Sequence, residues 1–141
     1  MNEQIRDVIL DRARRLTAGD APGVVAHNAP EVVEYTLAPP LGGPADGHDP
    51  KPLEAWLQTF EAPPKREVTQ LEITADGDVA FATSIDSMTA VPRGATEPFT
   101  LWYRATLGLR RVDGRWLITH EHNSVPFLMD GSLRAAVDLT P

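Results

Sequence analysis

The sequence predicts an α+β domain in which helices precede a curved antiparallel sheet. Two patterns predict this fold class. Apolar residues recur at helical spacing over residues 3–18, whereas from Lys65 apolar and polar residues alternate, almost to Pro126. Helices and strands segregated along the chain in this way are typical of helices packed on one face of an antiparallel sheet. With 141 residues, 42% of them hydrophobic, the chain has the size of one domain, and no internal repeat divides it.

Composition excludes several classes of function. The net charge of -7 argues against nucleic acid or an anionic membrane as the main partner, because both require a basic surface. The absence of cysteine excludes disulfides, thiolate metal sites and a cysteine nucleophile. The first 20 residues lack the apolar run of a signal peptide, and no window approaches transmembrane length. A soluble, cytoplasmic protein is therefore expected.

The N-terminal half predicts helices, one strand and a loop. The helix over residues 3–18 has one apolar face, on which Arg12 is the polar exception. Asp20 and Pro22 begin a second, short helix that runs to about Asn28. Strand propensity follows over 31–37, and a further helix over 52–60 presents Leu53, Trp56, Leu57 and Phe60 on one side. The proline- and glycine-rich residues 38–52 between them predict a long loop, and such loops are often binding segments.

The C-terminal half predicts two hairpins. Strands over 67–74 and 79–90 are joined by an Asp-Gly turn, and Phe81 and Ile85 share the apolar face of the second strand. Asp86 lies on the opposite face. It is a candidate general base if that face lines a cavity, but a solvated or interface carboxylate is the favoured interpretation. The second hairpin, 101–127, turns at residues 112–114, in a pattern that resembles a type I turn followed by a left-handed glycine. The tail over 128–141 is expected to be peripheral, with a short helix near 133–137.

The second hairpin carries the candidate chemistry, in two alternative registers. Alternation places Trp116, Ile118, His120 and His122 on one face and Glu121 and Asn123 on the other. In one register, Arg104 joins Glu121 and Asn123 in a polar cluster beside Trp102. In the other register, Arg104 and Thr106 lie with the two histidines, and a single bulge converts one arrangement into the other. His120 and His122 alone do not predict a metal site, because no third ligand is evident.

The same hairpin resembles a known family. The segment DGRWLITHEHNSVPF, preceded by Arg104-Ala105-Thr106, is similar to SnoaL-like and ketosteroid isomerase-like proteins of the nuclear transport factor 2-like superfamily. The weaker match ITADGDVAFATS at 73–84 and the closing VDLTP extend the resemblance over most of the second half. The hairpin also resembles the association domain of calcium/calmodulin-dependent protein kinase II, a non-enzymatic oligomerisation module.

The resemblance implies a cystatin-like cone, with a curved sheet wrapped around the N-terminal helix, an apolar pocket between them and dimers formed through the sheet. Enzymes of this superfamily move protons with a carboxylate or histidine and without cofactors. Steroid isomerisation is not expected here, because Tyr35 or Thr36 occupies the position of the isomerase base and the other two parts of the isomerase site are absent. The resemblance also favours the register in which Trp102, Arg104, Thr106, Thr119, Glu121 and Asn123 face the pocket.

The sequence therefore predicts a homodimer that binds a small organic ligand, with no cofactor and no metal. If it is an enzyme, Glu121 is the expected acid/base, Arg104 the anion anchor and Asn123 the orienting group. The ligand-binding residues expected around them are Tyr35, Trp56, Phe60, Phe81, Trp102, Thr106 and Thr119. The alternative is a non-enzymatic association module of the same fold.

Overall fold

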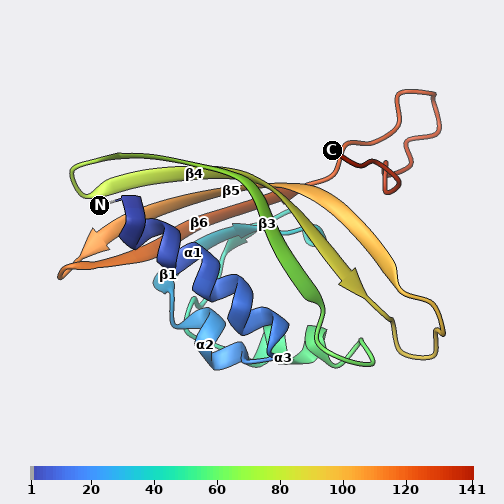
Figure 1. Cartoon of the computed structure of the whole chain (residues 1–141), viewed down its shortest axis with the longest axis horizontal. Coiled ribbons are helices and arrows are strands. Elements are labelled where there is room, and N and C mark those ends of the chain that lie inside the picture. Colours follow the sequence, from blue (N-terminus) through green and yellow to red (C-terminus); the bar gives the residue numbers. More distant parts are fainter. Residues whose placement is uncertain (1) are drawn as a thin grey trace.

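The computed structural model, which describes residues 2–141, is an α+β fold with one six-stranded sheet. Its elements are α1 (Asn2–Thr17), α2 (Ala21–Val25), β1 (Asn28–Tyr35), β2 (Gly43–Pro44), α3 (Lys51–Leu57), β3 (Lys65–Asp76), β4 (Val79–Ala90), β5 (Phe99–Val112) and β6 (Arg115–Ser124). The strand order is β2-β1-β6-β5-β4-β3. Neighbouring strands are antiparallel except β1 and β6, which are parallel. The predicted fold class, with a curved sheet and an N-terminal helix, is confirmed (Figure 1).

The sheet curves over α1, so that one of its faces is inner and the other is outer (Figure 1). α1 turns Ile5, Ile9, Ala13 and Leu16 inward, as its helical periodicity predicts. Ile5 and Ile9 pack with Val32, Ala82, Leu107, Leu109, Trp116 and Ile118 in the main core cluster. Arg12 is buried on this same inward face, which requires a partner inside the fold.

The hairpin between β5 and β6 has a tighter turn than the sequence pattern indicates. Asp113 and Gly114 both have positive φ, 51° and 79°. Val112 pairs directly with Arg115, so Asp113 and Gly114 form the whole loop. Positive φ at both positions defines a type I′ turn, which matches the twist of the flanking strands. The predicted type I turn is therefore wrong.

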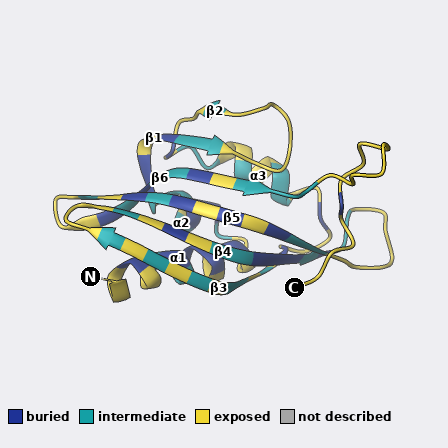
Figure 2. Cartoon of the chain, turned by 90° about the horizontal axis from the view of Figure 1, so that it is seen from above, coloured by how far each residue is buried: buried dark blue, intermediate teal, exposed yellow. Residues whose placement is uncertain are grey.

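A bulge at Thr119 decides which face of β6 is inside. Leu109 pairs with Ile118 and Gly108 with His120, which leaves Thr119 as an extra residue in β6. Before the bulge, Trp116 and Ile118 point inward; after it, Glu121 is the buried residue. The extra residue thus separates the two histidines from the tryptophan and isoleucine with which strict alternation groups them. The alternating burial along the strands is visible in Figure 2.

The loop and the tail differ in detail from expectation. The loop predicted over 38–52 contains the short strand β2, and it folds back on β1 through hydrogen bonds between Asn28 and the backbone oxygen of Gly47 (3.1 Å) and between His48 and the backbone oxygen of Asn28 (3.0 Å). The tail runs away from the sheet (Figure 1) and is held by a bridge between Phe127 and Ala135, with no helix over 133–137.

Candidate functional site

Two buried ion pairs lie on the inner face of the sheet: one joins α1 to β6, and the other joins the neighbouring strands β3 and β4. Arg12 of α1 binds Glu121 of β6 through two hydrogen bonds, of 2.8 and 2.7 Å. Arg66 of β3 donates to one oxygen of Asp86 on β4, at 2.7 and 3.2 Å. A distance of 3.8 Å between Arg66 Nη2 and Glu121 Oε2 links the pairs into one network. Two cations and two anions balance each other, as burial of charge requires.

Glu121 is held ionised. Burial alone would raise the pKa of its carboxyl, but the charge and hydrogen bonds of Arg12, the charge of Arg66 and a hydrogen bond from Asn123 lower this pKa to about 2. The whole Glu121 residue is only 5% exposed. A carboxylate with so low a pKa and with its oxygens already occupied is a weak proton acceptor at neutral pH.

Glu34 lies beside Glu121, and its pKa is shifted in the opposite direction. The two residues are register partners on the parallel pair β1 and β6, and both belong to the inner face. Burial is the main cause that raises the pKa of Glu34, the negative charge of Glu121 adds to it, and the charge of Arg12 partly offsets both. Glu34 is only partly buried, so its carboxyl remains within reach of solvent.

Polar and aromatic groups continue the site towards α3. Tyr103 is 6% exposed, its ring lies 5.7 Å from the guanidinium carbon of Arg66, and burial raises the pKa of its phenol to about 12. Tyr103 therefore stays protonated and available as a hydrogen-bond donor. Asn123 Oδ1 is buried without a hydrogen-bond partner among the described residues. This acceptor is free to receive a hydrogen bond.

The sequence assigned several residues to the wrong face. Arg104 does not meet Glu121: it is exposed on the outer face and donates to Ser124 Oγ at 3.1 Å. The predicted polar cluster of Arg104 with Glu121 is therefore wrong, because Arg104 pairs across the ladder with Ser124 whereas Leu107 pairs with Glu121. The actual partner of Glu121 is Arg12, the polar exception on the helix.

The expected ligand-binding residues divide in the same way. Trp56 and Phe60 lie inside, with their ring centroids 5.0 Å apart, and Trp56 packs on the cluster of Met88, Tyr103 and Ala105. The others do not line the interior: Thr119 lies in the bulge, and Tyr35, Phe81, Trp102 and Thr106 share the outer face. Tyr35 packs edge-on against His120 and His122 there, at 4.9 and 5.3 Å, and Phe81 is 52% exposed.

Two hollows on the described part of the chain are lined by residues away from Glu121. One lies beside the irregularity of β3 near Gln70, and the other lies at the end of the cone where α1 begins. Residues 2–141 also contain no group of three or more histidine or acidic side chains that is arranged to hold a metal ion.

Comparison with known proteins identifies the family of this chain. The family description "SnoaL-like domain" matches residues 49–128, more than half of the chain. The chain belongs to the SnoaL-like family. An NTF2-like protein of unknown function from Pseudomonas putida KT2440 is similar over 99% of this chain and 95% of its own, with 29% identity and a TM-score of 0.85. A search of curated proteins found no match.

Two more distant structures share the fold of this SnoaL-like chain. A proposed scytalone dehydratase from Novosphingobium aromaticivorans has 16% identity and a TM-score of 0.78, and the match covers 99% of this chain and 94% of that one. A proposed calcium/calmodulin-dependent protein kinase II association domain from Xanthomonas campestris has 19% identity and a TM-score of 0.72, with 85% and 84% covered. At these identities the likeness shows the fold alone.

Sequence reasoning on this SnoaL-like chain missed three site residues: Glu34, Arg66 and Tyr103. Asp86 was considered, but the expectation of a solvated carboxylate is wrong, because it is 1% exposed and paired with Arg66. A signal for Glu34 was present, because alternation from the buried Val32 places it on the inner face. No comparable sequence pattern marked Arg66, which looks like any other charged residue at the start of a strand.

None of the described helices is long and apolar enough to cross a membrane.

Proposed function

We propose that this SnoaL-like protein binds a small organic ligand on the inner face of its sheet and transfers a proton within it, with Glu34 as the acid/base. The observation that carries the proposal is the contrast between Glu34 and Glu121. A general base works best with a pKa near the operating pH, and burial together with the charge of Glu121 moves the pKa of Glu34 in that direction.

Glu121 then acts indirectly. Its carboxylate is held by Arg12, so it keeps its negative charge and does not exchange protons at neutral pH. A fixed negative charge beside Glu34 disfavours ionisation of Glu34 and so strengthens it as a base. This assignment replaces the expectation that Glu121 itself moves the proton, and it leaves Arg104, on the outer face, without a role in the chemistry.

Two neutral groups suit the polar end of a ligand. Tyr103 keeps its phenolic proton and can donate to an oxygen at the distant end of a ligand, because it lies two strands and four residues away from Glu34. Asn123 Oδ1 can accept a hydrogen bond from a ligand hydroxyl or amide. Trp56 and Phe60 supply an apolar surface, which suits a small carbonyl compound without a large charge.

A generic base-catalysed reaction tests the proposal without knowledge of the natural substrate. 5-Nitrobenzisoxazole opens when a base removes its ring proton, and the phenoxide product is coloured. Glu34→Gln should lose the rate enhancement of the parent protein, since the amide cannot accept the proton. Arg104→Ala, on the outer face, should leave it unchanged. A Glu34→Gln protein that is folded and as fast as the parent would overturn the assignment.

The second candidate is a non-enzymatic association module, in which the outer face binds another copy of the chain. It is supported by exposed apolar side chains on that face, Phe81 at 52%, Val79 at 50% and Tyr35 at 39%. Large apolar groups exposed together often mark interaction sites. The two candidates are compatible, because the outer face and the site around Glu34 lie on opposite sides of the sheet.

A further inference from the structure

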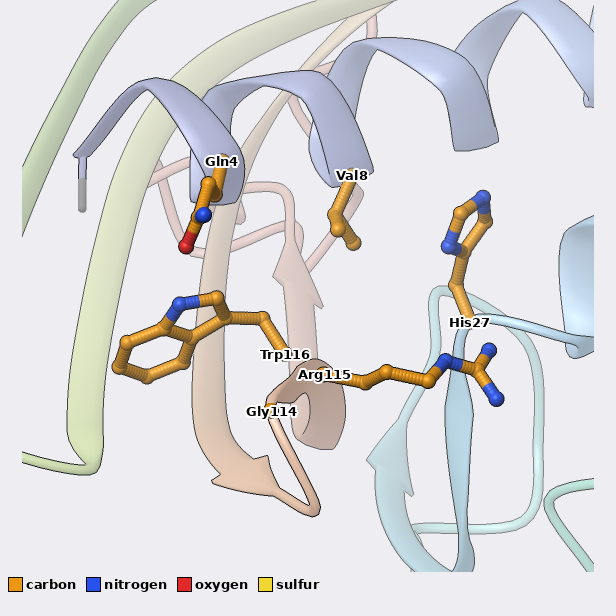
Figure 3. A pocket seen from close by; sticks show the side chains of 6 residues that line it. All are labelled: Gln4, Val8, His27, Gly114, Arg115 and Trp116. Carbon is orange, nitrogen blue, oxygen red and sulfur yellow. The ribbon is translucent and has the colours of Figure 1, made fainter.

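A cavity at the end of the cone lies apart from the site around Glu34. It has a volume of about 240 Å³ and opens between the first turns of α1 and the start of β6. Figure 3 shows the residues that line it: Gln4, Val8, His27, Gly114, Arg115 and Trp116. The volume is smaller than that of a typical drug-sized pocket, so only a small molecule fits.

Trp116 brings an unused hydrogen-bond donor to this cavity. The residue is 4% exposed, and its Nε1 atom is buried with no hydrogen-bond partner among residues 2–141. In Figure 3 the edge of the indole that carries the nitrogen is turned towards α1 and Gln4. A buried N–H group that lacks an acceptor is unfavourable, so an acceptor that reaches it from the cavity is favoured.

The indole is held in place before any ligand arrives. Trp116 packs in the main core cluster, and the guanidinium carbon of Arg111 lies 5.4 Å from its ring centroid. Arg111 is itself bound to Asp78 at 2.7 Å, which neutralises its charge. The donor is therefore fixed in direction, and a fixed donor loses little entropy when it binds an acceptor.

The lining of the cavity contains one cationic side chain, Arg115, and no anionic one. Arg115 forms no ion pair with a carboxylate within the described chain, and Figure 3 shows its side chain extended towards His27. His27 is engaged through Nε2 with Asp11 at 2.8 Å. Val8 and the face of Trp116 supply apolar surface beside the donor.

We infer that this cavity binds a small organic carboxylate with a short apolar body. The carboxylate accepts from Trp116 Nε1, and the apolar body contacts Val8 and the indole. The charge of Arg115, whose side chain extends away from the indole towards His27, attracts the anion over a longer distance. A neutral molecule of the same size lacks the attraction to Arg115. This site is independent of the proposed chemistry at Glu34.

The indole N–H resonances in ¹⁵N-labelled protein report on the site directly. The chain has three tryptophans, and the resonance lost in Trp116→Phe identifies Trp116. Benzoate should move that resonance with a dissociation constant on the order of 1 mM, as expected for a ligand of its size, and benzyl alcohol should move it much less. Arg115→Ala should weaken benzoate about fivefold, the usual range for an exposed charge pair, whereas Arg104→Ala should have no effect.

Three results would overturn the inference. The first is a Trp116 resonance that does not move in benzoate well above 1 mM, a concentration on the order of the expected constant. The second is an equal response to benzyl alcohol, with no loss of affinity in Arg115→Ala. The third is binding that is seen only in Gln4→Ala, because the Gln4 amide would then be the natural acceptor for the indole.

Discussion

Glu34 and Glu121 lie opposite each other on the parallel strands β1 and β6, and their pKa values are shifted in opposite directions. Arg12 causes most of this difference, because it binds both oxygens of Glu121 at 2.7 and 2.8 Å and leaves Glu34 without an equivalent partner. Two neighbouring carboxyls with separated pKa values allow one to stay ionised while the other exchanges protons near neutral pH.

Glu34→Gln should stabilise the protein at pH 8 by up to about 1 kcal/mol. The pKa of Glu34 is higher in the folded than in the unfolded state, so its contribution to stability is complete below the ordinary value of 4.5 and is lost as pH rises through the folded pKa. Urea denaturation of the parent and the variant at pH 4 and pH 8 measures this. Glu31→Gln, at an exposed position of the same strand, is the control and should show no such difference.

Arg12→Met should lower the free energy of unfolding by about 3–5 kcal/mol, because it leaves the buried Glu121 carboxylate without its main partner. The double variant Arg12→Met/Glu121→Leu should recover most of this loss, since no charge is then left unpaired. Arg14→Met, which breaks an exposed pair with Asp11, should cost less than about 1 kcal/mol. A double variant as unstable as Arg12→Met alone would show that packing, rather than charge, dominates at this position.

Acid should remove the stabilisation that Glu121 provides. Because its pKa is lowered from 4.5 to about 2 on folding, the contribution is present above pH 4.5 and is lost as pH falls from 4.5 towards 2. Circular dichroism of thermal unfolding over this range should show a steeper fall in Tm for the parent than for Arg12→Met/Glu121→Leu. Equal slopes in the two proteins would contradict the low pKa of Glu121.

Much of the fold was readable from the sequence, because periodicity reports which residues share a face. α1 and β4 were predicted within a residue or two of their observed bounds, and the helical pattern correctly placed Arg12 on the buried face. Periodicity does not report which face of a strand is inner. In β4, the apolar Phe81 suggested an inner face, yet Phe81 is exposed and the charged Asp86 is 1% exposed, because Arg66 is available to pair with it.

The candidate site was harder to predict because it depends on contacts between distant segments. Arg12 and Glu121 are 109 residues apart, and no local pattern identifies them as partners. The bulge at Thr119 adds a second obstacle, since one extra residue reverses the orientation of every later side chain in β6. On β5, Trp102, Arg104 and Thr106 were placed on the wrong face, whereas Glu121 and Asn123 of β6 were placed on the correct side.

Phe81→Glu tests association through the outer face. If copies of the chain pair through this face, the variant should become monomeric in size-exclusion chromatography with light scattering, since a buried charge without a partner opposes association. Asp76→Ser, at the exposed end of β3, is a control that should keep the parent state. A parent protein that is already monomeric, or a Phe81→Glu variant of unchanged mass, would exclude this face as the interface.

Titration of the two glutamate carboxyls is the most direct test of the division of roles between them. In protein labelled with ¹³C at glutamate, assigned by Glu34→Gln, the Glu34 carboxyl should titrate with a midpoint above 4.5, and Glu121 should remain ionised down to a pH of about 2. A Glu34 midpoint at or below 4.5 would contradict its role as the proton-transferring group.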